Sequence, residues 1–351
     1  MSEARTDPDL LYVGTYTDNI YLVRMDRRSG ELLQVGSVNA GARPSFLAIH
    51  PNKRVLYAAN ETDKGAVSAY TIDKANGTLA RLNEQPSEGG APCYVSVDRT
   101  GRTLLVANYA GGNVALLPIE ANGALRPAAS AIKHTGTGPN AERQEAPHAH
   151  CIMPDPSNGF ALAADLGADR VFVYRLDLNE QALHAVSEAV MRPGAGPRHI
   201  AFHPTLPLVL AANELSSTVS TLHFDPARGA LSLLGTVSTV PAPRTGTNYP
   251  ADIHLDRAGR TLYVSNRGHN SIAVFSVTNE GGLSLEQTIS TEGDWPRNFT
   301  LDPTGRWLLV ANQKSNSIVV FGRDDASGTL TATGQRIAVP SPVCLRFDAS
   351  A

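Results

Sequence analysis

The segment LYVSNRGHNSIAVF, residues 262–275, decides the fold because the chain repeats it with variations. In each copy a short apolar strand leads into a polar turn, and an alternating strand follows the turn. Steps between copies range from 45 residues (Thr15 to Asn60) to 57 residues (Asn108 to Asp165). The apolar strands end at Thr15, Asn60, Asn108, Asp165, Asn213, Asn266 and Asn312. A period of this length indicates an architecture built from adjoining copies of one unit.

Each repeat carries the pattern of four short strands. An apolar strand and a turn precede each anchor after the first, as FLAIHPNKR precedes LYAAN. An alternating strand such as AVSAYTID follows, and a fourth strand such as NGTLARLNE comes after a glycine-containing turn. The alternation and the Gly, Asn and Asp turns exclude a helical solenoid. The sequence therefore predicts an all-β, seven-bladed β-propeller with four antiparallel strands per blade.

The two ends of the chain predict how the ring closes. The first repeat, LLYVGTYT, begins with the second strand of its blade and lacks the first. The C-terminal PSPVCLRF resembles RPSFLAIH and GPRHIAFH, which open other repeats. We expect residues 343–347 to supply the missing strand of the first blade, because that strand pairs an otherwise open edge. This predicts one propeller domain over residues 10–349, with residues 1–9 as a flexible N-terminus.

Composition and charge narrow the possible partners. The 351 residues carry a formal net charge of −3, which is too small and too scattered to predict a nucleic-acid or membrane partner. Cys93, Cys151 and Cys344 have neither a metal-binding spacing nor a disulfide pattern, as in proteins of a reducing compartment. The N-terminal MSEARTDPDL has no apolar signal core, and no run approaches the roughly 20 apolar residues of a membrane span. We expect a soluble cytoplasmic protein, either a monomer or a small homo-oligomer.

Comparison of the repeats separates residues that a blade needs from residues that are free to form a site. In an antiparallel blade the start of strand one and the end of strand two lie at the same end. Both positions therefore surround one mouth of the central channel. The charged residues that occur there in single copies are His148, Arg198, His199, Glu214, Asp252, Arg267 and Arg297. Together they predict a site for an anionic ligand, with a purely structural Glu214–Arg267 ion pair as the alternative.

Further candidates lie beside this group. Two long linkers, residues 133–150 and 240–250, enter the same mouth, and their charged candidates are Arg143, Glu145 and Arg244. Substrate-binding candidates at neighbouring ring positions are Glu61, Tyr109, His150 and Asn298. His148 and His150 alternate as two metal ligands would, but the sequence offers no third ligand at a suitable spacing. We therefore predict neither a metal nor another cofactor.

Several motifs also resemble a known family. GPNAERQEAPHAHCI, GPRHIAFHP, AANELSSTVSTL and SNRGHNSIAVF are similar to segments of the seven-bladed lactonases, which include propeller-type 6-phosphogluconolactonases and the fungal 3-carboxy-cis,cis-muconate cyclase. The resemblance runs from about residue 11 to about residue 347. The residues implicated in the cyclase branch correspond here to His148, Arg198, Glu214 and Arg267. The resemblance implies a metal-independent lactonase for an anionic sugar lactone, with 6-phospho-D-glucono-1,5-lactone as the leading substrate.

Lactone hydrolysis needs an activated water and a stabilised tetrahedral oxyanion. We predict Glu214 or His148 as the general base, with the other orienting the water or donating a proton. Arg267 or Arg198 then stabilises the oxyanion. The predicted substrate-binding residues are Arg297, His199, Asp252, Asn298, Glu61, Tyr109, His150 and Arg143. Two alternatives stay open, namely a muconate-type lactonizing cycloisomerase that uses the same groups, and a non-catalytic propeller that binds another protein.

Overall fold

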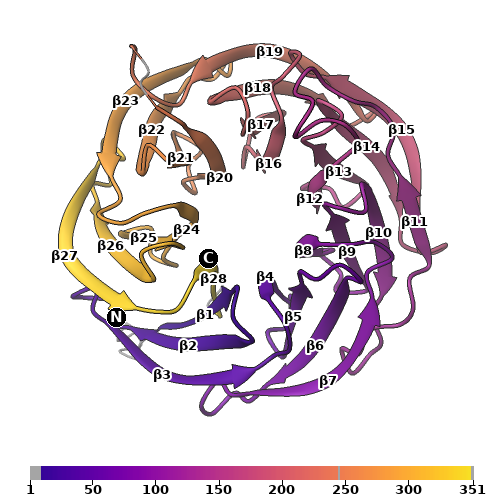
Figure 1. Cartoon of the computed structure of the whole chain (residues 1–351), viewed down its shortest axis with the longest axis horizontal. Coiled ribbons are helices and arrows are strands. Elements are labelled where there is room, and N and C mark those ends of the chain that lie inside the picture. Colours follow the sequence, from indigo (N-terminus) through magenta and orange to yellow (C-terminus); the bar gives the residue numbers. More distant parts are fainter. Residues whose placement is uncertain (1–8, 244–245, 349–351) are drawn as a thin grey trace.

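The computed structural model describes residues 9–243 and 246–348, which form seven four-stranded antiparallel sheets arranged in a ring (Figure 1). Blades are numbered one to seven in chain order, and blade one has the strand order β28-β1-β2-β3. The described residues include no helix that is long and apolar enough to cross a membrane. The predicted seven-bladed, all-β propeller is confirmed.

Each blade runs outwards from the centre of the ring through four strands (Figure 1). The innermost strands of blades one to seven are β28 (Pro342–Phe347), β4 (Pro44–Ile49), β8 (Pro92–Val97), β12 (Ala149–Pro154), β16 (Pro197–Phe202), β20 (Tyr249–Leu255) and β24 (Pro296–Leu301). The second strands are β1 (Asp9–Thr15), β5 (Val55–Asn60), β9 (Thr103–Asn108), β13 (Phe160–Asp165), β17 (Leu208–Asn213), β21 (Thr261–Arg267) and β25 (Trp307–Asn312).

Two further layers complete the blades. The third strands are β2 (Asn19–Met25), β6 (Ala66–Ile72), β10 (Asn113–Pro118), β14 (Arg170–Asp177), β18 (Thr218–Asp225), β22 (Ser271–Val277) and β26 (Ser317–Arg323). The outermost strands are β3 (Leu32–Asn39), β7 (Leu79–Pro86), β11 (Ser130–Lys133), β15 (Ala182–Val190), β19 (Ala230–Ser238), β23 (Leu283–Ser290) and β27 (Leu330–Ala338).

The second strands are more buried than the outermost strands. This difference explains why the second strand of each repeat is apolar and the fourth is largely polar. Every residue of β5, β9, β17 and β25 is buried, because neighbouring blades cover both faces of these strands. Sequences such as LYAAN and LLVAN are therefore continuously apolar and rich in alanine. The outer strand β3 has no buried residue and β19 has none either. At the centre of the ring, polar side chains can thus meet at the strand ends that face the channel.

Tyrosines of the second strands link neighbouring blades. Tyr12 Oη donates to the carbonyl of Gly77 in the next blade at 2.8 Å, and Tyr57 Oη makes the same bond to Gly123 at 2.9 Å. Gly77 has a φ of +80°, and a Cβ atom there would lie 2.0 Å from a methyl carbon of Leu10. Glycine at this turn therefore permits both the left-handed backbone and the close contact between blades.

The C-terminal strand closes blade one as predicted. β28 pairs antiparallel with β1, with Leu11 opposite Phe347 and Val13 opposite Leu345. β1 begins at Asp9, the last residue of the predicted N-terminal segment 1–9, where Asp9 pairs with Met25 and forms an ion pair with Arg27. The predicted flexible residues 1–8 and the predicted domain end at residue 349 lie outside the described residues.

Candidate functional site

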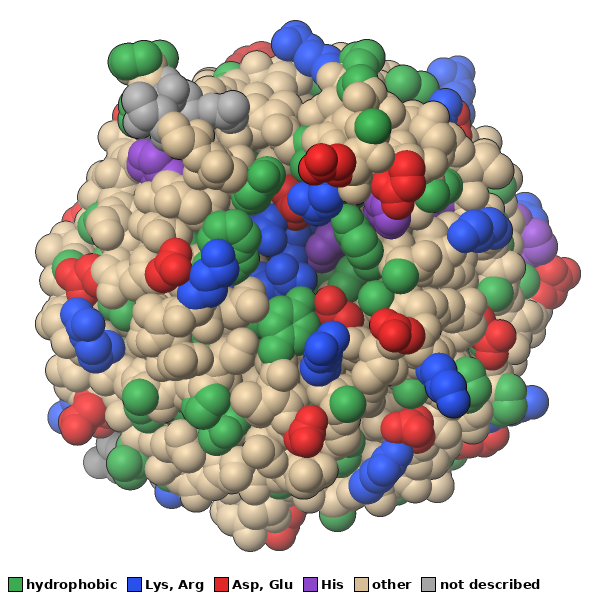
Figure 2. All heavy atoms as spheres, in the orientation of Figure 1, with side chains coloured by type: hydrophobic (Ala, Val, Ile, Leu, Met, Phe, Trp, Pro, Cys, Tyr) green, Lys and Arg blue, Asp and Glu red, His purple; other side chains and the backbone are tan. Residues whose placement is uncertain are grey.

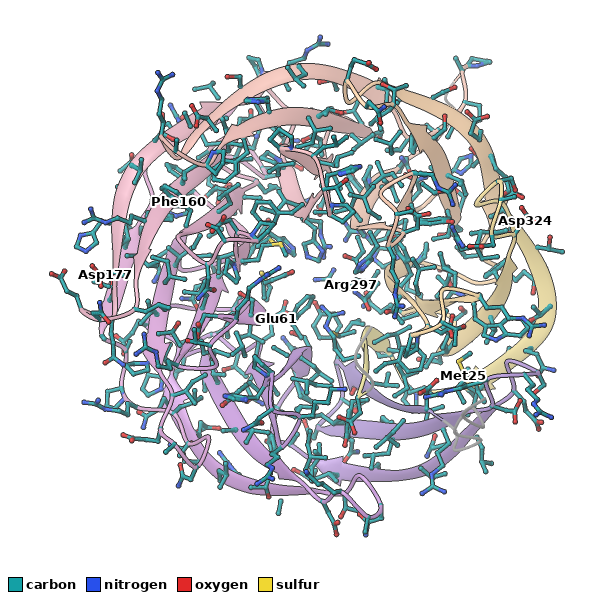
Figure 3. The ribbon with its side chains drawn as sticks, turned by 180° about the vertical axis from the view of Figure 1, so that it is seen from behind. Met25, Glu61, Phe160, Asp177, Arg297 and Asp324 are labelled. Carbon is teal, nitrogen blue, oxygen red and sulfur yellow. The ribbon has the colours of Figure 1, made fainter. Side chains whose placement is uncertain are left out.

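A β-bulge opens the innermost strands at the predicted mouth. In β16 Pro197 pairs with Asn213 and the next pair is His199 with Ala212, so Arg198 has no partner in the ladder. Arg297 is bulged in the same way at the start of β24. A bulge redirects the side chain of its extra residue, and bulges are common beside active sites. Figure 3 shows Arg297 at the centre of the ring.

The ring position of His148 differs from the prediction. The sequence comparison aligned His148 with Arg198 because a proline precedes each of them. In the structure His150 is the bulged residue of β12, and it is therefore the counterpart of Arg198. The carbonyl of His148 accepts a hydrogen bond from Leu166 N at 3.0 Å, a bond that other blades make with the residue just before the innermost strand. His148 thus lies at the rim, because Pro147 lies two positions before the first residue of β12, whereas Pro197 is itself the first residue of β16.

Glu214 is the centre of a cluster of arginines. It follows β17, and its Oε2 atom lies 3.0 Å from Arg198 Nε and 2.5 Å from Arg267 Nη2. The other oxygen, Oε1, accepts a 2.7 Å hydrogen bond from Arg143 Nη2 on the linker before β12. Side chains from three blades therefore converge on one carboxylate. Arg198, Arg267 and Glu214 are almost fully buried, whereas Arg143 is one-third exposed.

The three arginines around Glu214, here called the arginine clamp, keep its carboxylate ionised. Burial disfavours the carboxylate, but the positive charges of Arg267, Arg198 and Arg143 outweigh it and lower the pKa of Glu214 to about 2. Burial, with repulsion from Arg267 and Arg297, lowers the pKa of Arg198 to about 9, so it is charged at neutral pH. A carboxylate with so low a pKa and with arginines on both oxygens is a weak proton acceptor. Glu214 therefore suits the role of holding the arginines in place.

Arg297 is the cation of this mouth that lacks a neutralising partner. Within the described part of the chain it forms neither an ion pair nor a hydrogen bond, and its guanidinium carbon lies 5.2 Å from the ring centroid of Tyr16. Tyr16 Oη donates to Glu61 Oε1 at 3.0 Å beside it. Burial opposes its charge, but Tyr16, Glu61 and Glu214 raise the pKa of Arg297. The guanidinium is charged and its donors are available to a ligand.

His148 is held in one orientation at the rim. Its ring stacks on Tyr109 with 4.4 Å between centroids, and Nδ1 lies 3.0 Å from the carbonyl oxygen of Tyr109. Because a carbonyl only accepts, Nδ1 carries a proton and donates it. The opposite nitrogen, Nε2, lies 3.1 Å from Glu145 Oε1, on a half-exposed side chain. Tyr109 Oη also accepts from Arg143 Nη2 at 3.2 Å, which connects His148 to the clamp around Glu214.

The remaining predicted residues lie deeper in the channel. His199, Asp252 and Asn298 follow one another in blades five, six and seven, and each is at most 4% exposed. Asp252 Oδ1 accepts from His199 Nδ1 at 2.8 Å, and Asp252 Oδ2 accepts from the side-chain amide of Asn298. Burial and the charge of Arg198 hold the pKa of the neighbouring His150 well below its usual range. These four residues form a buried layer beneath the arginines.

Aromatic residues of the mouth were missed by the sequence comparison. The guanidinium carbon of Arg267 lies 5.5 Å from the ring centroid of Trp295 and 6.0 Å from that of Tyr249. Lys314 Nζ lies 3.5 Å above the same Trp295 ring. Tyr249 is the first residue of β20 and Trp295 directly precedes β24, so both directly precede the proline at the start of an innermost strand, and this position was the available signal. The candidate Arg244 lies outside the described residues.

The mouth carries an excess of positive charge. Five cations face three carboxylates, and these groups are Arg143, Arg198, Arg267, Arg297, Lys314, Glu61, Glu145 and Glu214. On the face shown in Figure 2, Lys or Arg and His side chains line a hollow at the centre of the ring, with acidic side chains near its edge. Two uncompensated positive charges in a partly buried site match a ligand of charge −2.

A second hollow opens at the opposite end of the channel. This cavity of about 780 Å³ is lined by the C-terminal ends of innermost strands. Its residues include Tyr94, His199, Asp252, His254 and Arg346. None of the arginines around Glu214 lines it. The buried layer of His199 and Asp252 therefore separates the arginine-rich mouth from the cavity on the other face.

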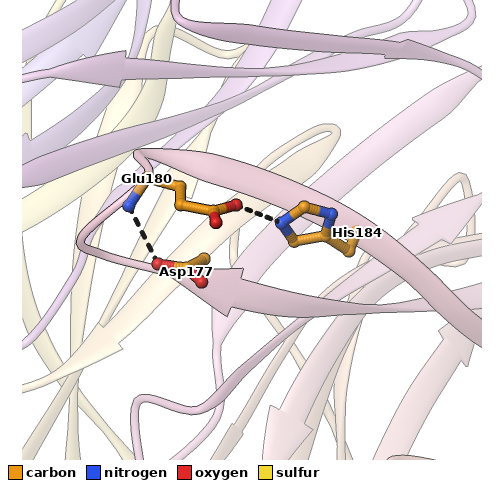
Figure 4. A group of neighbouring side chains, drawn as sticks. All are labelled: Asp177, Glu180 and His184. Carbon is orange, nitrogen blue, oxygen red and sulfur yellow. Dashed lines mark hydrogen bonds and ion pairs between the residues drawn. The ribbon is translucent and has the colours of Figure 1, made fainter.

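One group among the described residues has three metal-type ligand atoms close together, and it lies away from the channel. Asp177, Glu180 and His184 meet at the turn between β14 and β15, where Glu180 Oε2 lies 3.2 Å from His184 Nε2 (Figure 4). Figure 3 shows Asp177 at the periphery of the ring. Asp177 Oδ1 accepts from the backbone of Glu180, which is ordinary turn chemistry.

Comparison with known proteins assigns the chain to one family. Residues 10–347 match the family described as "Lactonase, 7-bladed beta-propeller". The 6-phosphogluconolactonase of Bacillus subtilis is 39% identical over 345 residues, which cover 96% of this chain and 97% of that protein. A crystal structure of a Lactobacillus plantarum protein superposes with a TM-score of 0.92 at 38% identity, covering 97% and 99% of the two chains. The periplasmic gluconolactonase PpgL of Pseudomonas aeruginosa gives 0.90 at 34% identity, covering 98% and 99%.

Proposed function

Because the chain belongs to the seven-bladed β-propeller lactonase family, we propose that it hydrolyses an anionic sugar lactone, namely 6-phospho-D-glucono-1,5-lactone. The relative from Bacillus subtilis bears the name of this activity. The observation that carries the proposal is Arg297, a charged guanidinium at the centre of the ring without a protein partner among the described residues.

Arg297 binds the phosphate of the substrate in this proposal. A guanidinium offers a planar set of donors that matches phosphate oxygens. The excess of two positive charges around the mouth offsets the charge of a phosphate dianion. The ring of Tyr16, which is bonded to Glu61, lies against one side of Arg297, and no described residue accepts a hydrogen bond from its donors.

His148 acts as the general base. Its Nδ1–H group is fixed on the carbonyl of Tyr109, so the neutral ring has its lone pair on Nε2, the nitrogen that donates to Glu145 Oε1 while the ring is protonated. When the half-exposed Glu145 side chain moves aside, a water molecule can bind at Nε2 and attack the lactone carbonyl carbon. The proton passes from this water to Nε2, and the imidazolium then returns it to the ring oxygen as the carbon–oxygen bond breaks.

Arg198 and Arg267 stabilise the oxyanion that forms on the carbonyl oxygen. Both guanidinium groups are buried and are held by Glu214, so they need little reorganisation during the reaction. Glu214 thereby serves as the anchor of the arginines, and His148 takes the role of base. Of the two assignments that the sequence left open, this proposal takes His148 as the base and Glu214 as the anchor.

We further propose that the reaction needs no metal and takes place in the cytoplasm. Guanidinium groups supply the positive charge that a Lewis acid would otherwise provide at the oxyanion. Cys93, Cys151 and Cys344 are free, buried thiols, which suits a reducing compartment. Dialysis against a strong chelator should leave the rate unchanged, whereas a rate lost on dialysis and restored by one divalent ion would contradict metal independence.

The direct test is hydrolysis of freshly prepared 6-phospho-D-glucono-1,5-lactone, after subtraction of the spontaneous rate. We expect saturable hydrolysis by the purified protein, reduced about 100-fold or more in His148→Gln. His223→Gln is the matched control, because His223 is exposed on β18. No excess rate on phosphorylated or free aldonolactones would refute the proposal. Turnover of a carboxymuconate without any lactone hydrolysis would instead support the cycloisomerase, whose two carboxylates the same arginines could bind.

A further inference from the structure

Arg198 is connected to the opposite face of the ring by a chain of buried polar contacts. Arg198 Nη1 lies 3.3 Å from His199 Nε2, and His199 Nδ1 lies 2.8 Å from Asp252 Oδ1. Asp252 Oδ2 then lies 3.0 Å from Nε2 of His254, a partly exposed residue that lines the cavity on the other face. With the contact between Arg198 and Glu214, these groups span the layer between the two hollows.

The direction of each hydrogen bond in this chain follows from its partners. A guanidinium has donors only, so His199 Nε2 must accept from Arg198 Nη1. The proton of the neutral ring is therefore on Nδ1, which donates it to Asp252. Both oxygens of Asp252 also accept backbone bonds, from Ile253 N at 3.1 Å and from Phe299 N at 3.3 Å. One tautomer of His199 satisfies both of its neighbours, and the other would place N–H against N–H.

We propose that His199 and Asp252 are positioning residues that fix the guanidinium of Arg198 for catalysis, rather than residues that contact the substrate. Arg198 is held by Glu214 at Nε, and by His199 and the carbonyl of Ala251 at Nη1, the latter at 2.5 Å. Among the described residues Nη2 has no hydrogen-bond partner and Nε has only its ionic contact with Glu214, so Nη2 is the donor that remains for the substrate. His199 and the carbonyl of Ala251 thus help to set the orientation of Nη2 from the side away from the mouth.

The surroundings of His199 keep this arrangement rigid. Its ring meets those of Phe46 and Tyr94 edge-on, with centroids 5.8 and 5.1 Å away. Burial and the charge of Arg198 outweigh the pull of Asp252 and lower the pKa of His199 to about 3, so the ring stays neutral at neutral pH. A protonated ring would present a donor to Arg198 and push the guanidinium away.

Comparison of the blades shows that the fold does not require a histidine at this position. The residues that follow the bulge in other blades include Phe46, Tyr94, Cys151 and Cys344. His199 and Asp252 occupy this position in adjacent blades, so their side chains meet. The fold of a blade therefore tolerates an apolar residue at the position after the bulge. The polar pair of His199 and Asp252 occurs where it can contact Arg198. Removal of groups that orient a catalytic group typically costs about 10- to 100-fold in activity.

This inference rests on the proposed function, and two variants of one residue test it. His199→Phe keeps a planar ring but offers Arg198 no acceptor, whereas His199→Gln places an amide oxygen near the position of Nε2. We expect His199→Phe and Asp252→Asn to lower kcat on 6-phospho-D-glucono-1,5-lactone by about 10- to 100-fold. His199→Gln should restore most of this loss, and KM should change little in all three. Equal losses in His199→Phe and His199→Gln, or no loss in His199→Phe, would overturn the proposal.

A second measurement separates this inference from the proposed function. In the protein labelled with nitrogen-15 histidine, the imidazole nitrogen shifts of His199 should show protonated Nδ1 and unprotonated Nε2 at neutral pH. Asp252→Asn should alter this pattern. These shifts do not depend on turnover, so the expected tautomer in a protein without lactonase activity would refute the function alone. A protonated Nε2 in the wild-type protein would refute the positioning role, whatever the activity.

Discussion

Arg198 Nε lies 3.0 Å from Glu214 Oε2, and both side chains are almost fully buried at the mouth of the channel. Arg198 is the bulged residue at the start of β16, and Glu214 follows the end of β17. The antiparallel ladder brings these two strand ends together, so the fold of blade five itself builds the pair. Arg267 adds a third charge from blade six, which ties two blades to one carboxylate.

Glu214→Gln should destabilise the protein as well as inactivate it. The amide keeps the shape of the side chain but leaves Arg198 and Arg267 buried without a negative partner. Breaking a buried ion pair in this way costs about 3–5 kcal/mol. Urea denaturation measures the loss, with Glu188→Gln as the control, because Glu188 pairs with Arg170 on the exposed surface and its loss should cost at most about 1 kcal/mol. Unchanged stability in Glu214→Gln would show that the clamp contributes nothing to folding.

Acid should remove the contribution of Glu214 to stability. Its pKa is lowered from 4.5 to about 2, so the folded state favours the ionised form. The stabilisation is therefore fully present above pH 4.5 and is lost as pH falls through about 2. The measurement is the difference in unfolding free energy between wild type and Glu214→Gln across this range. We expect the difference to shrink on acidification, and a difference that grows would contradict the assigned charge state.

Repeat comparison predicted the architecture and the polar residues of the mouth. Seven anchors at regular steps determine the number of blades, and the likeness of PSPVCLRF to the strand-one openings predicted β28. Arg198, Glu214 and Arg267 stood out because most of their equivalents in other repeats are uncharged, and the structure brings these three into contact. Equivalent positions of a repeat fold become neighbours around one axis, so a comparison within one chain contains spatial information.

Details that depend on backbone irregularity could not be predicted. The residue pattern does not reveal the bulge that redirects Arg198. Because Pro147 precedes His148 as Pro197 precedes Arg198, the repeat comparison equated His148 with Arg198, whereas the structural equivalent of Arg198 is His150. The contact between Arg143 and Glu214 depends on the path of a long linker that has no repeated counterpart. That Arg297 has no ion pair or hydrogen bond among the described residues emerges only from their contacts in three dimensions.

Removal of the closing strand should prevent cooperative folding. A chain that ends at residue 342 lacks most of β28 and leaves β1 with an unpaired edge and exposed Leu11 and Val13. A chain that ends at Asp348 keeps β28 and serves as the control. Thermal unfolding followed by circular dichroism should show one sharp transition for the control and none for the shorter chain. An unchanged melting temperature in the shorter chain would contradict the role of β28 in ring closure.

The most direct test of the central claim is the effect of Arg297→Ala on two lactones. We predict that kcat/KM on 6-phospho-D-glucono-1,5-lactone falls by about 10- to 100-fold, since a hydrogen bond to a charged group contributes roughly 1.5–3 kcal/mol. The rate on unphosphorylated glucono-1,5-lactone should change little, and Arg24→Ala, at an exposed position of β2, should leave both rates unchanged. Equal losses on both lactones, or no loss on the phosphorylated one, would contradict the assignment of Arg297 as the phosphate-binding residue.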